Sequence, residues 1–233
     1  MLASGVKALF FDVFGTLVDW RSGVAREAEL LLRGRGVSLD WPALADAWRA
    51  QYQPSMEEIR SGRVPYTKLD LLHRQTLQRI LPRFGMENLP DADLDRLTLA
   101  WHRLDAWPDV QPGLARLRQR FLIAPVSNGN TAIMCDLARR NNFHWDAILG
   151  ADHARDFKPK PAVYLAAADA FDLRPEQCMM CAAHGSDLEA AAAVGLRTAF
   201  IARPEERPGS GDGPGPAEVH CRSVVDLATQ LGA

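Results

Sequence analysis

Cysteine, excess charge of one sign and long apolar runs are all scarce in this chain. Its 233 residues carry a formal net charge of −2, so the basic footprint that binds nucleic acid or an anionic membrane is absent, and neither is an expected partner. No apolar stretch approaches the roughly 18 residues of a membrane-spanning helix. The first apolar run contains Lys7 and lacks a small-residue cleavage site, so no secretory signal is expected.

The four cysteines include one CxxC motif, Cys178 and Cys181, which is able to be redox-active or to bind metal. The motif lies within the apolar run 178–183, where buried reduced thiols act as small hydrophobic side chains. No second CxxC and no nearby pair of histidines completes a zinc site. We therefore expect reduced thiols and a reducing, cytoplasmic location.

What the chain does contain is a regular alternation of short apolar runs and helical stretches. The expected strands are 6–12, 121–127, 145–149, 178–183 and 197–202, and the expected helices between and after them are 130–141, 161–171, 187–194 and 223–231. Near-continuous apolar strands that alternate with helices predict a parallel sheet covered on both faces. Pro125 weakens one of these strands, since proline cannot donate to a central ladder.

The interval 20–106 breaks this rhythm. It is helix-like almost throughout, with helices expected over 23–35, 41–60, 67–83 and 91–104. We expect a helical insertion that covers the strand ends, which gives a cap domain of residues 19–107 and a core domain of residues 1–18 and 108–233. The stretch 204–217 is rich in proline and glycine and is expected to form a flexible surface loop.

The first strand candidate ends in an acid. Residues 7–11 are mostly apolar, and Asp12, Phe14, Gly15 and Thr16 follow. A buried strand of this kind delivers its carboxylate to the sheet edge where open α/β folds place their chemistry. Phe14 stands where a second carboxylate would bind metal or donate a proton. One acid beside one aromatic ring indicates a nucleophile that faces an apolar substrate group, and a simple turn acid is the alternative.

Ser127 and Asn128 end a second strand candidate and lead into a glycine turn. Alone, such residues usually form a helix cap. If the end of their strand lies beside Asp12, however, a hydroxyl, an amide and free backbone N–H groups surround a bound anion.

Two further segments bring polar groups to the same edge. Lys158 is held between an aromatic residue and a proline, and Tyr164 follows about one turn into the next helix, where it is placed to orient the lysine. His184 and Asp187 follow the strand over 178–183. Asp187 is either a helix N-cap or a base, and His184 is either a turn histidine or part of the site. Several strand ends with polar groups directed at one pocket favour an active site.

These segments, in this order, resemble the haloacid dehalogenase (HAD) superfamily, and within it the L-2-haloacid dehalogenases. The resemblance covers nearly the whole chain and implies a HAD-like Rossmannoid core with a helical cap. The phosphatases of the superfamily carry a second aspartate where this chain has Phe14. They also carry a Gly-Asp-x-x-x-Asp type metal-binding stretch where this chain has residues 183–187. The similar dehalogenases need neither metal nor cofactor.

By position, the resemblance implies roles for particular residues. The implied catalytic residues are Asp12 as nucleophile, Thr16 as its supporting hydroxyl, Lys158 as counter-charge, Asp187 and His184 as activators of water, and Arg49 as acceptor of the leaving halide. The implied substrate-binding residues are Phe14, Arg49, Ser127, Asn128, Tyr164 and the cap residue Tyr66. An exposed helix arginine is the alternative for Arg49.

The implied reaction is the hydrolysis of an (S)-2-haloacid to an (R)-2-hydroxyacid and halide through an ester on Asp12. The expected partners are the haloacid, the halide ion and a second copy of the chain that docks through the cap. Family members often have Ser and Asn where this chain has Ala182 and His184, and an aromatic residue where it has Ser186. A magnesium-dependent phosphatase and a non-catalytic protein of the same fold remain the alternatives.

Overall fold

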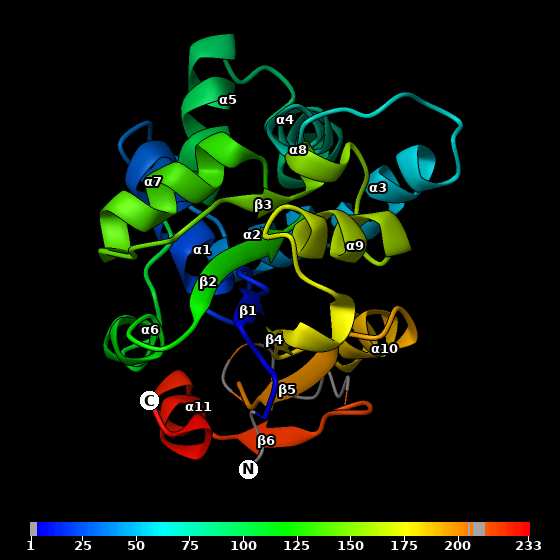
Figure 1. The fold of residues 1–233 in the computed structure, drawn as a ribbon. Coiled ribbons are helices and arrows are strands. Elements are labelled where there is room, and N and C mark those ends of the chain that lie inside the picture. Colours follow the sequence, from blue (N-terminus) through cyan, green and yellow to red (C-terminus); the bar gives the residue numbers. More distant parts are fainter. Residues whose placement is uncertain (1–3, 205, 207–212) are drawn as a thin grey trace.

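A parallel sheet of six strands forms the centre of the protein in the part that the structure describes, residues 4–204, 206 and 213–233 (Figure 1). In this computed structural model the strand order is β3-β2-β1-β4-β5-β6. The strands are β1 (Ala8–Phe11), β2 (Leu122–Ser127), β3 (Leu149–Gly150), β4 (Cys178–Ala182), β5 (Arg197–Ile201) and β6 (Val219–Cys221). The predicted α/β class with a central parallel sheet is confirmed.

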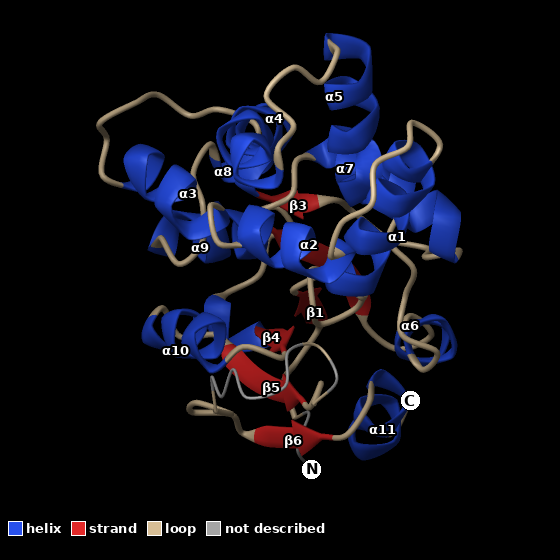
Figure 2. Ribbon diagram, turned by 180° about the vertical axis from the view of Figure 1, so that it is seen from behind, coloured by secondary structure: helices blue, strands red, loops and turns tan. Residues whose placement is uncertain are grey.

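Helices flank the sheet. Between β1 and β2 lie α1 (Trp20–Arg33), α2 (Trp41–Arg49), α3 (Tyr52–Arg60), α4 (Leu69–Ile80), α5 (Asp91–Thr98) and α6 (Val110–Leu117), with 3-10 turns at Leu81–Phe84 and Leu99–His102. After β2 come α7 (Thr131–Asn141), α8 (Ala151–Ala154), α9 (Pro161–Asp169), α10 (Gly185–Ala193) and α11 (Val224–Leu231). Figure 2 shows α3, α4 and α5 at one end of the molecule and β6 with α11 at the other. The predicted helical insertion between the first two strands is therefore present.

Both faces of the sheet are buried because successive strand residues point to opposite sides. Leu9 and Met179 belong to one apolar cluster, to which α1, α7 and α11 contribute. Phe10 and Met180 belong to a second cluster, to which α9 and α10 contribute. Burial on both faces explains why the strands read as near-continuous apolar runs.

The CxxC motif spans these two clusters. Cys178 lies in the cluster with α9, and Cys181 lies in the cluster on the opposite face. Both thiols are free and buried, and burial raises the pKa of Cys178 to about 12. These two residues pack as small hydrophobic side chains, as predicted.

The prediction of a strand over 145–149 is wrong, because β3 begins only at Leu149. Asp146 occupies the place beside β2 that a strand residue would take. Its backbone N–H donates to the Ile123 carbonyl at 3.0 Å, and its carboxylate accepts from the Ile123 N–H at 2.9 Å. The sequence did not predict strand β6 or the helices α6 and α8.

Pro125 fits in β2 because its missing N–H costs no ladder bond. Strand residues two apart direct their N–H groups to the same side, so Pro125 faces the side on which Ile123 bonds Asp146. On that side β3 pairs only with Val126 and Ser127. The proline therefore lies where the neighbouring strand has not yet begun.

The prediction of one helix over 41–60 is also wrong, because the chain forms α2 and α3 with a break at Ala50 and Gln51. Pro54 has no N–H to continue the helical ladder and instead occupies the first turn of α3. The break places Arg49 at the end of one helix and Tyr52 at the start of the next. In the described part of the chain, no helix is both long and apolar enough to cross a membrane.

Candidate active site

The carboxyl ends of β1, β2 and β4 open onto a cavity of about 530 Å³. Eight of the residues proposed from the sequence line it: Asp12, Phe14, Arg49, Asn128, Lys158, Tyr164, His184 and Asp187. Helix α3 supplies Tyr52, Gln53, Glu57 and Arg60 to the same wall. Residues from distant parts of the sequence therefore meet where the topology of a parallel sheet directs them.

Asp12 lies directly after β1 and is held by three side chains. Thr16 Oγ donates a hydrogen bond to Asp12 Oδ2 at 2.8 Å, and Lys158 Nζ donates to Oδ1 at 2.9 Å. His184 Nδ1 lies 3.2 Å from Oδ2. Thr16 Oγ also accepts from the backbone N–H of Ala183 at 2.9 Å, so this hydroxyl fastens the loop after β1 to the loop after β4.

The surroundings of Asp12 keep its carboxylate ionised. Burial raises the pKa of this carboxyl, but Lys158 and His184 outweigh burial and hold the pKa well below its usual range. Burial likewise disfavours the charged lysine, but Asp12 and Asp187 raise the pKa of Lys158 above its ordinary value. Asp12 is therefore a charged group at low exposure, which is the state a carboxylate nucleophile needs.

Asp187 is bound through both of its oxygens. Lys158 Nζ donates to Oδ2 and the Tyr164 hydroxyl donates to Oδ1, each at 2.5 Å. Burial is the largest influence on Asp187 and raises the pKa of its carboxyl, against the effect of Lys158. Tyr164 therefore reaches the lysine only through Asp187, rather than orienting it directly as the sequence indicated.

His184 lies between two carboxylates, one of which the sequence did not reveal. Its Nε2 atom is 3.1 Å from Glu206 Oε2, and Glu206 Oε1 accepts a hydrogen bond from the Trp20 indole at 2.9 Å. Burial lowers the pKa of His184, but the hydrogen bonds to Asp12 and Glu206 prevail and raise it to about 10.

The segment 204–217 was predicted to be a surface loop. Its residues 205 and 207–212 lie outside the described part, but Glu206 belongs to the site.

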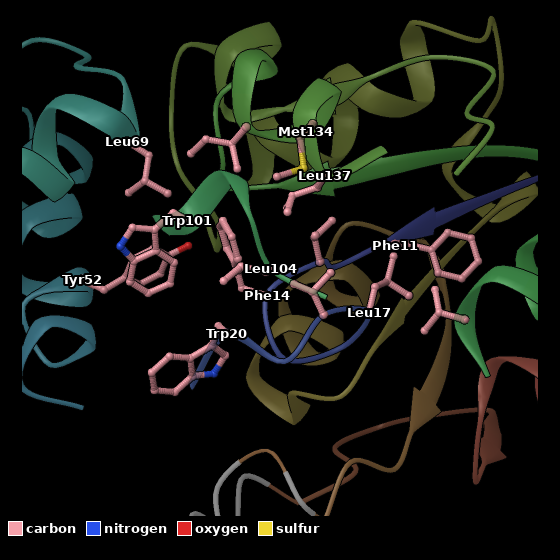
Figure 3. Close-up of a cluster of buried hydrophobic side chains, with 14 of the residues drawn as sticks. Phe11, Phe14, Leu17, Trp20, Tyr52, Leu69, Trp101, Leu104, Met134 and Leu137 are labelled. Carbon is pink, nitrogen blue, oxygen red and sulfur yellow. The ribbon is translucent and has the colours of Figure 1, made fainter. Parts of the chain in front are cut away.

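Arg49 faces the cavity from the end of α2. Its guanidinium carbon is 4.0 Å from the centre of the Tyr52 ring and 5.3 Å from that of Trp20, and its Nη1 atom is buried without a hydrogen-bond partner in the described residues. The ring of Phe14 packs edge-on against Trp101 and Tyr52 at centroid distances of 5.6 and 6.4 Å, and Figure 3 shows these rings together. Arg49 is thus a partly unpaired cation in an aromatic wall.

Two of the proposed substrate-binding residues lie outside the cavity lining. Ser127 is fully buried, and its hydroxyl accepts from the Gly129 N–H at 3.0 Å, so it shapes the turn. Tyr66 donates to Asp152 at 2.8 Å, and its ring packs at a tilt of 38° against that of Phe157. Tyr52, the first residue of α3, lines the cavity instead, and its ring lies edge-on to that of Phe14.

Asn128 links the turn after β2 to the lysine. Its Oδ1 atom accepts from the backbone N–H of Lys158 at 2.7 Å, and its side chain lines the cavity. Among residues 4–204, 206 and 213–233, no three His, Cys, Asp or Glu side chains are grouped in a way that would hold a metal ion.

A family model described as haloacid dehalogenase-like hydrolase matches residues 6–195. The chain belongs to the haloacid dehalogenase-like hydrolase family. Other members of this family resemble it over most of their length. The (S)-2-haloacid dehalogenase 1 of Pseudomonas sp. (strain CBS-3) is 30% identical over 202 residues, which are 85% of each chain.

Solved structures of the family are closer still. A defluorinating L-2-haloacid dehalogenase is 43% identical, with a TM-score of 0.95 over 98% of this chain and 96% of its own. Another L-2-haloacid dehalogenase is 45% identical, with a TM-score of 0.93 over 97% of this chain and 99% of its own. The resemblance proposed from the sequence is confirmed.

Proposed function

We propose that this haloacid dehalogenase-like hydrolase converts (S)-2-haloacids to (R)-2-hydroxyacids and halide. The similar proteins described above carry the names of L- or (S)-2-haloacid dehalogenases. The observation that carries the proposal is the placement of one ionised carboxylate, Asp12, in the same cavity as Arg49, a cation with a buried N–H that has no partner among the described residues. This arrangement supplies a nucleophile and an acceptor for a leaving anion.

In the first half-reaction, Asp12 attacks C2 of the haloacid from behind the carbon–halogen bond. A carbon–oxygen bond forms, the halide leaves with the bonding electrons, and an ester of Asp12 results. Phe14 and Tyr52 exclude water from the attacking oxygen, which strengthens a nucleophile that water would otherwise solvate. A guanidinium presents several N–H donors on one cationic plane, and Arg49 therefore suits the departing halide.

In the second half-reaction, water attacks the carboxyl carbon of the Asp12 ester and releases the hydroxyacid. Lys158 lies at Oδ1 of Asp12 and Thr16 at Oδ2, so hydrogen-bond donors contact both oxygens on which negative charge develops. Asp187 holds Lys158 in place. Because displacement occurs on carbon and hydrolysis on the aspartate, the product is inverted at C2.

A phosphatase is the nearest alternative, since a phosphoglycolate phosphatase from Photorhabdus laumondii is 27% identical over 199 residues. The groups around Asp12 are a lysine, a histidine, a threonine and the ring of Phe14. Among the described residues, none of the groups in contact with Asp12 is an acid able to protonate a leaving group or bind magnesium, since Asp187 and Glu206 contact Lys158 and His184 instead. The donor set therefore favours displacement at carbon.

One assay separates the two activities. The purified protein is incubated with (S)-2-chloropropionate and EDTA, and separately with p-nitrophenyl phosphate and magnesium. Chloride release in the first mixture supports the proposal, phosphate release in the second alone selects the phosphatase, and neither product selects a non-catalytic protein. Asp12→Asn is expected to abolish chloride release, and Asp169→Asn, at an exposed position, serves as the matched control.

The proposal extends to the organisation of the chain. Residues 19–107 form the cap domain, and residues 1–18 and 108–233 form the core. Four of the six exposed large hydrophobic side chains in the described residues, Leu30, Val64, Leu71 and Leu99, belong to the cap, which supports a homodimer through that domain.

The free thiols support a reducing, cytoplasmic setting.

A further inference from the structure

Two cationic side chains contact Asp12, and each of them also contacts a second carboxylate. Lys158 contacts Asp187, and His184 contacts Glu206. When Asp12 becomes a neutral ester, both cations lose the anion that they share, yet each keeps a carboxylate partner. Asp187 has both oxygens engaged by Lys158 and Tyr164, whereas His184 presents its other ring nitrogen directly to the Asp12 carboxyl group.

Glu206 is fixed in the site rather than placed there loosely. Its side chain is 14% exposed, and the Trp20 indole donates to it. Gly15 makes room for it, because a Cβ at that position would lie 2.0 Å from Glu206 Oε1. The glycine of the loop after β1, which has φ +88°, therefore lets a carboxylate reach the histidine beside the nucleophile.

We infer that Glu206 is a positioning residue that turns His184 into the general base for hydrolysis of the Asp12 ester. A carboxylate at Nε2 fixes the neutral imidazole as the tautomer with its proton on Nε2 and its lone pair on Nδ1. Nδ1 is the atom that faces Asp12. This inference rests on the proposed function, and it assigns to Glu206 a part in the second half-reaction only.

The charges change in the order that the two half-reactions need. Before displacement, His184 is protonated and helps to keep Asp12 ionised. Once the ester has formed, the negative charge has left with the halide, so the imidazolium faces one carboxylate instead of two and its pKa falls. His184 is 27% exposed and loses its proton to solvent through the cavity.

The hydrolytic step then balances. Water gives a proton to Nδ1 of His184 while its oxygen bonds the Asp12 carboxyl carbon. The tetrahedral species breaks the bond to the alkyl oxygen, and that oxygen takes the remaining proton as the hydroxyacid leaves. Asp12 is again a carboxylate and His184 is again an imidazolium. The sum is haloacid plus water to hydroxyacid, halide and one proton.

The test separates the half-reactions in Glu206→Gln, because glutamine still accepts from Trp20 but carries no charge. Rapid mixing of excess (S)-2-chloropropionate with the variant is expected to give a burst of about one chloride per site, followed by turnover that is about 10²–10⁴-fold slower, the range of general-base catalysis. Mass spectrometry of the quenched enzyme is expected to find the Asp12 ester. Glu218→Gln, at an exposed ion pair with Arg197, is the matched control.

A merely structural role for Glu206 would not move the pH profile of ester hydrolysis. His184 faces Asp12 and Glu206, and the charges of Lys158 and Arg49 act on these two carboxylates. Removing the Glu206 charge is therefore expected to move the limb of the pH–rate profile that reports His184 to lower pH. Glu206→Asp keeps the charge and is expected to bring this limb part of the way back toward its position in the parent.

Each outcome decides the inference. A burst with accumulated ester and a shifted limb supports it. Parent-like turnover with an unshifted limb overturns it, and so does a variant that loses the burst together with turnover, since Glu206 then acts on the whole site. If the unmodified protein itself gives no chloride, the proposed function fails instead.

Discussion

Replacing Lys158 by methionine removes the cation that joins the two buried carboxylates of the site. Methionine is nearly as long as lysine, and Lys158 is about 6% exposed, so the change removes a buried charge with little change of volume. Asp12 then faces burial and the charge of Asp187 with His184 as its remaining cationic neighbour. Burial and the negative charge of Asp187 both favour the protonated carboxyl of Asp12, so we expect its pKa to rise.

The size of this effect follows from the burial of the pair. Removing one partner of a buried ion pair costs about 3–5 kcal/mol, and each pKa unit corresponds to about 1.36 kcal/mol. The acid limb of the chloride burst is therefore expected to move up by roughly 2–4 pH units.

The same change affects the stability of the fold. Because the depressed pKa of Asp12 stabilises the folded state above the unfolded value of 3.8, the parent is expected to lose stability as the pH falls below that value, and the variant is expected to lose less.

The assay is the rate of the chloride burst between pH 3 and pH 9, measured for the parent, for Lys158→Met and for Lys68→Met, which alters an exposed lysine. The parent rate is expected to stay level down to pH 3, because its Asp12 titrates below that range, whereas the Lys158→Met rate is expected to fall toward the acid end. Two profiles that coincide would refute the reasoning, because Asp12 would then be ionised without its counter-charge.

Three further predictions concern single side chains. Arg49→Ala is expected to slow the chloride burst by about 10- to 10²-fold, since a charge-assisted partner of the leaving anion is worth roughly 1.5–3 kcal/mol, and an unchanged burst would remove Arg49 from the reaction. Tyr66→Phe is expected to keep kcat/KM because its hydroxyl bonds Asp152 outside the cavity; a ten-fold loss would contradict this placement. His184→Gln removes a group whose folded pKa is raised from 6.5 to about 10. Its stabilising effect is complete below pH 6.5 and lost as the pH rises through 10, so the difference in Tm from the parent is expected to shrink over that window.

The central residues of the site were predictable because the topology of the sheet brings them to one edge. Asp12, Asn128 and His184 each follow an apolar strand, and the carboxyl ends of parallel strands lie at one edge. Lys158 was recognisable from the proline that follows it and from the resemblance. No long-range information beyond the strand order was needed for these residues.

Glu206 was not predictable for the opposite reason. It lies in a stretch rich in proline and glycine without apolar periodicity, so its sequence neighbourhood gives no direction to its side chain. Its partners Trp20 and His184 are 186 and 22 residues away. Only the fold brings these three together.

The helical insertion between β1 and β2 shows an intermediate case. Its helices were predictable from their period, but the choice between Tyr52 and Tyr66 depended on the break between α2 and α3. That break is a local effect of Pro54, and it leaves Tyr52 rather than Tyr66 in the wall of the cavity. Ser127 illustrates the same limit, since its position at the strand end was correct while its hydroxyl is used by the turn.

The most direct test of the ester mechanism is a single turnover in ¹⁸O-labelled water with enzyme in excess over (S)-2-chloropropionate. After digestion, the peptide that contains Asp12 and the hydroxyacid are both weighed. The ester route predicts one ¹⁸O atom in Asp12 and none in the hydroxyacid. Labelled hydroxyacid with unlabelled Asp12 would show that water attacks the substrate directly.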